Sequence, residues 1–157
     1  LAAAYDRRVI VERGISAREI EISVLGNEEP VASVPGEVIP KDIFYSYEDK
    51  YLNGVAELVI PAQLSEERSE LMRALAVRAY KAIDCAGMAR VDFFIDKNTD
   101  EIFLGELNTI PGFTQISMYP KLWQASGLPY AASVESLITL AFERKAERDK
   151  TEREFKA

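Results

Sequence analysis

The alternation of apolar and polar positions predicts a series of short strands in the first part of the chain. Residues 18–25 alternate most regularly, with Ile20, Ile22 and Val24 on one side and polar side chains on the other, which is typical of a half-buried strand. A turn-prone Gly-Asn-Glu-Glu follows at 26–29. Shorter strands are expected over 8–11, 31–34, 37–39 and 58–61. Together these segments predict antiparallel, meandering strands.

Helices are predicted in the second half. Ser65 has the properties of an N-cap for a helix with two glutamates in its first turn, and Gly87 is typical of the point where such a helix stops. The apolar stripe of this helix consists of Leu71, Leu75, Ala79 and Ile83, flanked by Met72, Ala76 and Tyr80. A short helix is expected over 119–126 and a last one from near Tyr130. The order of elements predicts an α+β fold, an antiparallel sheet with helices packed on one side.

A hairpin is predicted over residues 89–112. Val91, Phe93 and Ile95 alternate with other residues, a polar turn follows at 97–100, and a second strand is expected over 101–108. Side chains two positions apart share one face of a strand. One shared face is therefore expected for Arg90 and Asp92, and another for Ile102, Leu104, Glu106 and Asn108.

If the polar faces of the two strands coincide, two carboxylates and an amide oxygen gather beside Arg90. These are Asp92, Glu106 and Asn108. Hard oxygen ligands of this kind suit magnesium. The alternative is that they are solvent-exposed polar residues on a half-buried hairpin.

The segment from 40 to 54 shows neither period and is rich in tyrosine and charge. Long irregular loops in compact domains are often functional. The alternative is a surface crossover whose aromatic side chains pack against the sheet.

Composition narrows the function classes. The chain has 157 residues, of which 48% are hydrophobic and 29% charged, and a net charge of −7. These values indicate one globular domain and argue against nucleic-acid binding as the main function. The absence of histidine excludes histidine-based triads and the usual zinc sites. The lone Cys85, with no long apolar run and no signal peptide, favours a cytoplasmic location without a membrane partner.

The start of the chain carries neither a methionine nor a helix start signal, although residues 1–5 look like the tail of a helix. We therefore expect a fragment of a longer polypeptide. We expect residues 1–145 to form one domain and residues 146–157 a charged helical tail.

A magnesium cluster beside an arginine, in a chain without histidine, favours phosphoryl transfer. The chain contains neither a GxxxxGK[ST] phosphate loop nor a GxGxxG fingerprint, which excludes P-loop and Rossmann enzymes.

The run ARVDFFID…EIFLGELNTIPGFTQISMYPKLW resembles the C-terminal part of the D-alanine–D-alanine ligases, members of the ATP-grasp family. VIVERGISAREIEISVLGN resembles their adenine-binding hinge, and FYSYEDKYLNG resembles their substrate-covering loop. The three segments occur in the family's order over nearly the whole chain. The resemblance implies that residues 1–145 are the family's C-terminal ATP-grasp catalytic domain. The family's N-terminal domain and small central subdomain have no counterpart here, so the isolated chain is expected to be inactive or nearly so.

The resemblance implies a role for each matching residue. Asp92, Glu106 and Asn108 match the ligands of a pair of magnesium ions, for which manganese can substitute, and Arg90 matches the arginine that contacts phosphate. The backbone N–H of Gly112 matches part of an oxyanion site.

The resemblance also implies contacts with ATP and with substrate. The adenine and ribose contacts match Glu12, Arg13, Ile15 and Glu19. The groups around the second D-alanine match Lys50, Tyr51 and Ser117. Tyr51 stands where the related D-alanine–D-lactate ligases usually have histidine, which favours the dipeptide-forming type.

The implied reaction uses ATP to activate one D-alanine as an acyl phosphate, which the amine of a second D-alanine then attacks. This reaction serves peptidoglycan synthesis, and the full-length enzymes are commonly homodimers. Two alternatives stay open. One is another ATP-grasp carboxylate–amine ligase, and the other is a non-catalytic module that binds nucleotide or assembles with partners.

Overall fold

The computed structural model describes residues 1–40 and 57–152 of the chain. Its strands are β1 (Ala17–Gly26), β2 (Val31–Ala32), β3 (Gly36–Ile39), β4 (Glu57–Val59), β5 (Gly87–Asp96) and β6 (Ile102–Asn108). Its helices are the 3-10 turn η1 (Ala2–Ala4), α2 (Glu66–Ala82), α3 (Met118–Ala125) and α4 (Tyr130–Asp149). The predicted α+β class is confirmed.

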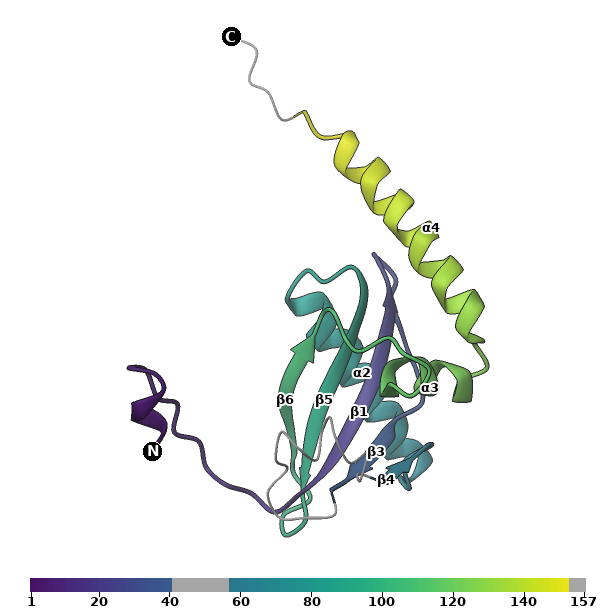
Figure 1. Cartoon of the computed structure of the whole chain (residues 1–157). Coiled ribbons are helices and arrows are strands. Elements are labelled where there is room, and N and C mark those ends of the chain that lie inside the picture. The colour runs from purple at the N-terminus through teal and green to yellow at the C-terminus, as the bar shows by residue number, and fades with distance from the viewer. Residues whose placement is uncertain (41–56, 153–157) are drawn as a thin grey trace.

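One antiparallel sheet organises the molecule, with the strand order β4-β3-β1-β5-β6 and with β2 paired to β1 (Figure 1). β1 and β5 lie at its centre and pair along their whole length, from Ala17 opposite Asp96 to Gly26 opposite Gly87. The other strands extend this pair, and α2, α3 and α4 pack against it.

The helix α2 covers one face of the sheet. Ser65 caps it by accepting a hydrogen bond from the Arg68 N–H at 3.2 Å, as the sequence predicts. The core beneath it joins alternate residues of β1 and β5 to one side of the helix: Ile20, Ile22, Val24, Met72, Ala76, Tyr80, Val91 and Phe93. The Tyr80 hydroxyl donates to the Gly26 carbonyl at 2.8 Å, which satisfies it in the core.

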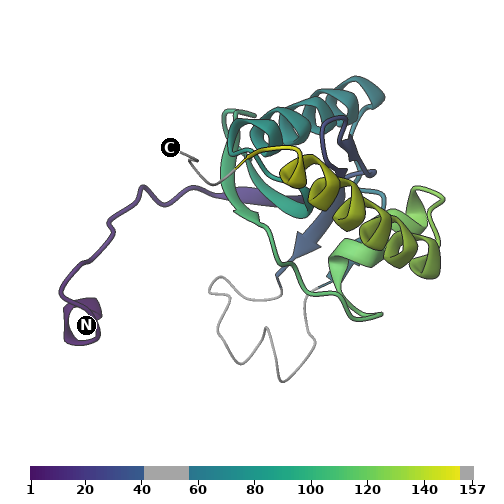
Figure 2. The ribbon, with the colours of Figure 1, turned by 90° about the horizontal axis from the view of Figure 1, so that it is seen from above.

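The opposite face is covered by α3 and part of α4, so the expectation of helices on one side is corrected. Leu25 packs against Tyr119 and Trp123 of α3, and Val38 packs against its Met118 and Leu122. Leu25 is adjacent to Val24 and therefore points to the other face of β1. Figures 1 and 2 show α2 and the α3–α4 pair as separate layers. Two helical layers are needed because apolar side chains occur on both faces of the strands.

The segment before β1 differs from the prediction. The strand expected over 8–11 does not form among the described residues, and Val9, Ile10 and Val11 are 47%, 84% and 91% exposed. Figure 1 shows this segment leading away from the sheet toward η1. The apolar run alone could not predict a strand, because a strand also needs a neighbour with which to pair.

The far end of the chain forms one helix. α4 runs without interruption past position 145, where the sequence suggested a change from domain to tail. Within residues 1–40 and 57–152, no helix is both long enough and apolar enough to cross a membrane.

A bulge in β6 changes the predicted parity of the hairpin. Asp92 lies opposite Glu106 but Phe93 lies opposite Leu104, which leaves Gly105 without a partner. Ile102 therefore packs toward the α2 core, while Glu106 and Asn108 lie on the other face. The prediction that Ile102 shares a face with Glu106 is wrong. The prediction that Glu106 and Asn108 face the same way as Arg90 and Asp92 holds.

Replacing Gly105 by alanine tests the bulge. A Cβ at this position would lie 2.7 Å from Phe94 Cε2 and 3.1 Å from the Asp92 carbonyl oxygen, so the ring or the strand has to move. We expect Gly105→Ala to lower the free energy of unfolding by about 1–3 kcal/mol, measured by urea denaturation. The control is Gly14→Ala, where a Cβ meets nothing within 4 Å. Equal effects of the two substitutions would contradict the close packing of the bulge.

Candidate active site

Four polar side chains predicted from the hairpin come together on the face opposite α2. Arg90 lies directly across from Asn108, and Asp92 lies directly across from Glu106. Side chains of such cross-strand pairs are close neighbours, with Cβ atoms about 5 Å apart. The structure therefore gathers Arg90, Asp92, Glu106 and Asn108 into one cluster.

Arg90 is held by two carboxylates. Its Nε and Nη2 donate to the two oxygens of Asp92, each at 2.7 Å, and its Nε lies 3.1 Å from Oε2 of Glu21. The side chains of Arg90, Asp92 and Glu21 are only 19%, 17% and 16% exposed. Because solvent reaches them so little, these ion pairs are screened less than pairs on the surface.

The surroundings keep Arg90 charged. Burial alone lowers the pKa of Arg90, but the hydrogen bonds to Asp92 and the charge of Glu21 raise it more, so this pKa lies above its ordinary value. The charge of Glu106 acts in the same direction. A pKa raised in the folded state means that the ion pairs stabilise the fold at neutral pH and lose their effect only in strong alkali. The cluster thus contains a permanent cation.

Glu21 is the member of the cluster that the sequence did not single out. It lies opposite Asp92 in the pairing of β1 with β5. The alternation of residues 18–25 places it on the polar side of its strand, but only the strand order brings that side next to Arg90.

The loop after β6 brings together Gly112 and Ser117, the other two predicted catalytic residues that are described. A Cβ built on Gly112 would lie 3.0 Å from Ser117 Oγ, so the two residues are in close contact. The Ser117 hydroxyl accepts a hydrogen bond from the Thr114 N–H at 3.1 Å and lies at the N-cap of α3. Backbone N–H groups and a hydroxyl at a helix N-terminus favour an anionic group nearby.

The predicted nucleotide contacts lie toward the other end of the sheet. Glu12 and Arg13 are exposed and Ile15 is half-buried in the segment before β1. The Arg13 guanidinium lies over the Phe103 ring, 5.7 Å from its centroid. Glu19 lies on β1 opposite Phe94, on the same face as Glu21. The remaining predicted contacts, Lys50 and Tyr51, lie outside the described residues.

The donor set fits a magnesium ion. Asp92, Glu106 and Asn108 offer the hard oxygens that this ion prefers. Both Asp92 oxygens accept bonds from Arg90, and Asn108 Oδ1 accepts one from the Ile110 N–H at 3.2 Å, yet each oxygen has a second lone pair. Among the described residues, no three Asp, Glu, Cys or His side chains lie close enough together to bind a metal ion, so a site with three protein ligands here would include the amide of Asn108.

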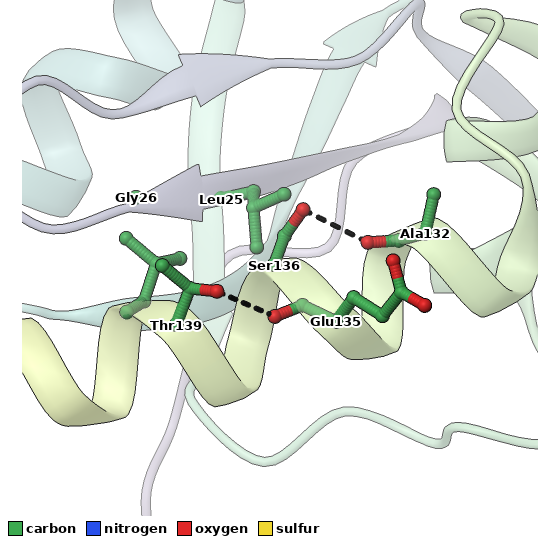
Figure 3. A pocket seen from close by; sticks show the side chains of 7 residues that line it. Leu25, Gly26, Ala132, Glu135, Ser136 and Thr139 are labelled. Atoms are coloured by element: carbon green, nitrogen blue, oxygen red, sulfur yellow. Dashed lines mark hydrogen bonds between the residues drawn. The ribbon is translucent and has the colours of Figure 1, made fainter.

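A separate depression lies between the Gly26 end of β1 and α4, with a volume of about 500 Å³ (Figure 3). Its polar lining is already engaged, because the hydroxyls of Ser136 and Thr139 donate to carbonyls one turn earlier in α4. It lies four residues along β1 from Glu21 and contains none of the predicted site residues. We assign it no part in the candidate site.

The chain is similar to proteins of one family. A family model described as "D-ala D-ala ligase C-terminus" matches residues 1–139. The D-alanine–D-alanine ligase of Clostridium novyi is 56% identical over 143 residues, which are 91% of this chain and 42% of that protein. The D-alanine–D-alanine ligase of Ruminiclostridium cellulolyticum is 59% identical over 92% of this chain and 39% of that protein. The chain thus spans about two fifths of the length of these relatives.

Solved structures agree with the sequence comparison. The D-alanine–D-alanine ligase from Coxiella burnetii superposes with a TM-score of 0.81 at 44% identity, covering 94% of this chain and 38% of that chain. VanG D-Ala:D-Ser ligase from Enterococcus faecalis gives a TM-score of 0.71 at 34% identity, covering 81% of this chain and 37% of that chain.

Replacing Arg90 by methionine tests the electrostatics of the cluster. The substitution leaves Glu21 and Asp92 without their cation, and we expect it to lower the free energy of unfolding at pH 7 by about 1–3 kcal/mol. Urea denaturation at pH 7 measures this.

The control is Lys145→Met, which breaks the exposed Lys145–Asp149 pair of α4. Such pairs contribute less than about 0.5 kcal/mol. A loss for Arg90→Met no larger than that of the control would contradict the electrostatic role of Arg90.

Proposed function

The chain belongs to the family of D-alanine–D-alanine ligase C-terminal domains, and from this premise we propose that it is the catalytic C-terminal part of an enzyme that uses ATP to join two D-alanines. The observation that carries the proposal is the cluster of Arg90 with Asp92, Glu106 and Asn108 on one face of the sheet. A fixed cation beside oxygen ligands for a metal is the arrangement that phosphoryl transfer requires.

The arrangement of the site supports ATP binding along the sheet. Arg13 contacts Phe103 near the start of β6, and Asn108 ends the same strand. Asn108 lies five positions after Phe103 along the strand, a span of about 17 Å. We propose that the adenine lies near Glu12, Arg13 and Ile15, the ribose at Glu19, and the phosphates at Arg90.

We propose that Asp92, Glu106 and Asn108 hold magnesium or manganese. A bound divalent ion neutralises charge on phosphate oxygens and so lowers the barrier to transfer. Arg90 supplies a second positive charge at the same place, and its high pKa keeps that charge at any working pH.

In the proposed reaction the carboxylate of one D-alanine attacks the γ-phosphorus of ATP, the bond to the bridging oxygen breaks, and ADP leaves. The amine of a second D-alanine then attacks the acyl carbon of the resulting acyl phosphate, loses a proton, and displaces inorganic phosphate. The backbone N–H of Gly112 is suited to stabilise the oxyanion that forms at that carbon. Ser117, in contact with Gly112, is suited to bind the carboxylate of the second D-alanine.

Lys50 and Tyr51 remain predicted contacts of that second substrate. The product would be a dipeptide for peptidoglycan and cell-wall synthesis, made in the cytoplasm. We expect the enzyme to be a homodimer that assembles through parts other than this chain.

A second candidate substrate comes from the likeness to the E. faecalis protein described as a D-Ala:D-Ser ligase. Its identity to this chain, 34%, is lower than the 56% of the C. novyi D-alanine–D-alanine ligase. We therefore favour D-alanine as the second substrate.

Phosphate release from ATP tests the proposed function. With the intact protein and magnesium, we expect release that depends on D-alanine and exceeds the release with D-serine, D-lactate or L-alanine at the second position. Product analysis should find D-alanyl-D-alanine. Absence of D-alanine-dependent phosphate release would refute the proposal, and a preference for D-serine would replace it with the second candidate.

Replacing the proposed metal ligands separates their role from a structural one. We expect Asp92→Ala and Asn108→Ala to lower kcat/KM at least about 100-fold, because charge neutralisation of the phosphates is lost. The melting temperatures of the same variants should stay close to that of the wild type. The control is Glu67→Ala, which removes an exposed carboxylate from α2 on the opposite face. Equal losses of activity and stability would favour a purely structural role.

A further inference from the structure

Glu21 contacts the proposed catalytic arginine but matches none of the roles assigned to the site. It lies in the middle of β1, between Gly36 of β3 and Asp92 of β5. Its Oε2 is 3.1 Å from Nε of Arg90, and its side chain is 16% exposed. A carboxylate in the centre of a sheet, largely shielded from water, costs folding free energy unless it is paired with a cation or a hydrogen-bond donor.

The two carboxylates act on one edge of the guanidinium. Asp92 accepts from Nε and Nη2, and Glu21 approaches the same Nε from the neighbouring strand. Nη1 makes no hydrogen bond to a residue that the structure describes. Because the guanidinium is planar with donors in fixed directions, holding this edge also fixes the direction in which Nη1 points.

The contacts of Asp92 show why this carboxylate by itself would not hold Arg90 in place once a metal ion binds. Both of its oxygens accept bonds from Arg90, and the proposed metal would bind the same oxygens. A divalent cation at Asp92 would compete with Arg90 for that carboxylate and repel its charge. Glu21 reaches Arg90 from β1, whereas the other proposed metal ligands, Glu106 and Asn108, lie on β6 on the far side of β5. Glu21 can therefore retain Arg90 while Asp92 serves the metal.

We propose that Glu21 is a positioning residue for the phosphoryl transfer, holding the guanidinium of Arg90 in its reactive orientation from β1. This inference rests on the proposed ligase function. It assigns to Glu21 no contact with ATP or D-alanine.

Steady-state kinetics of the intact protein test the proposal. We expect Glu21→Ala to lower kcat about 10–100-fold, as small misplacements of catalytic groups do, while KM for ATP changes less than about threefold. Glu21→Gln should give a kcat between those of the wild type and Glu21→Ala, because the side chain keeps its size but loses the charge that attracts Arg90. Glu67→Ala is again the control and should match the wild type.

A double-mutant cycle identifies the partner of Glu21. Arg90→Lys keeps the charge but removes Nε, so adding Glu21→Ala to this variant should lower kcat by less than about threefold. In protein without ATP, metal ion or D-alanine, the NMR signal of the Arg90 Nε–H should shift in Glu21→Ala and stay unchanged in Glu67→Ala.

Three outcomes would overturn the proposal: wild-type kcat in Glu21→Ala, the same loss with and without Arg90→Lys, or an unchanged Nε–H signal. If Glu21→Ala does not fold, Glu21→Gln takes its place, and wild-type kcat with an unchanged Nε–H signal in that variant would overturn the proposal. If the wild-type protein itself releases no D-alanine-dependent phosphate, the ligase function fails and the role of Glu21 fails with it. If the wild-type protein releases D-alanine-dependent phosphate and Glu21→Ala has the same kcat, only the positioning role of Glu21 is refuted.

Discussion

The pairing of β1 with β5 is the constraint on which both the core and the candidate site depend. Its ten residue pairs set Ile20, Ile22 and Val24 against α2 on one face. The same pairs set Glu21 opposite Asp92 on the other face. Since side chains alternate along a strand, a shift of one residue would turn the apolar set toward the site and the charged set toward the core. The α2 core therefore enforces the register that the charged cluster needs.

Stability alone does not account for the charges in this cluster. Glu21, Asp92 and Glu106 surround one arginine, and burial by itself works against the charge of Arg90. Ion pairs shielded from water usually gain little over apolar side chains of similar size. Among the described residues of the cluster, three carboxylates lie near one guanidinium, and negative charge gathered in this way favours the binding of an additional cation. Both the charges and the oxygen ligands of the cluster thus favour a role in binding a cation over a purely structural role.

Periodicity in the sequence predicted much of the fold and the composition of the cluster. It identified α2 with its cap at Ser65, the central strands, and the meeting of Asp92 with Glu106, because these depend on local pattern. It placed Ile102 on the wrong face, because the bulge at Gly105 depends on close packing with Phe94. It predicted α3 and α4 but not that they cover the second face, and it did not predict the contact of Glu21 with Arg90, because both depend on how the elements are arranged in space. The predicted nucleotide contacts rested on the resemblance to the ligase family, since Glu12 and Glu19 look like ordinary strand residues when read alone.

Along the second face of β1, the side chains are buried where α3 packs on them and charged where it does not. Leu25 packs under Tyr119 and Trp123, while Ser23 is still buried and donates from its hydroxyl to the Tyr119 carbonyl at 3.1 Å. Glu21, the next residue on that face, contacts Arg90 instead of the helix. The end of the helical cover therefore decides where an apolar face becomes a charged one. A site at this boundary gains rigidity from the core beneath it and low exposure from its surroundings, and these are the conditions under which a fixed arginine acts most strongly on a phosphate.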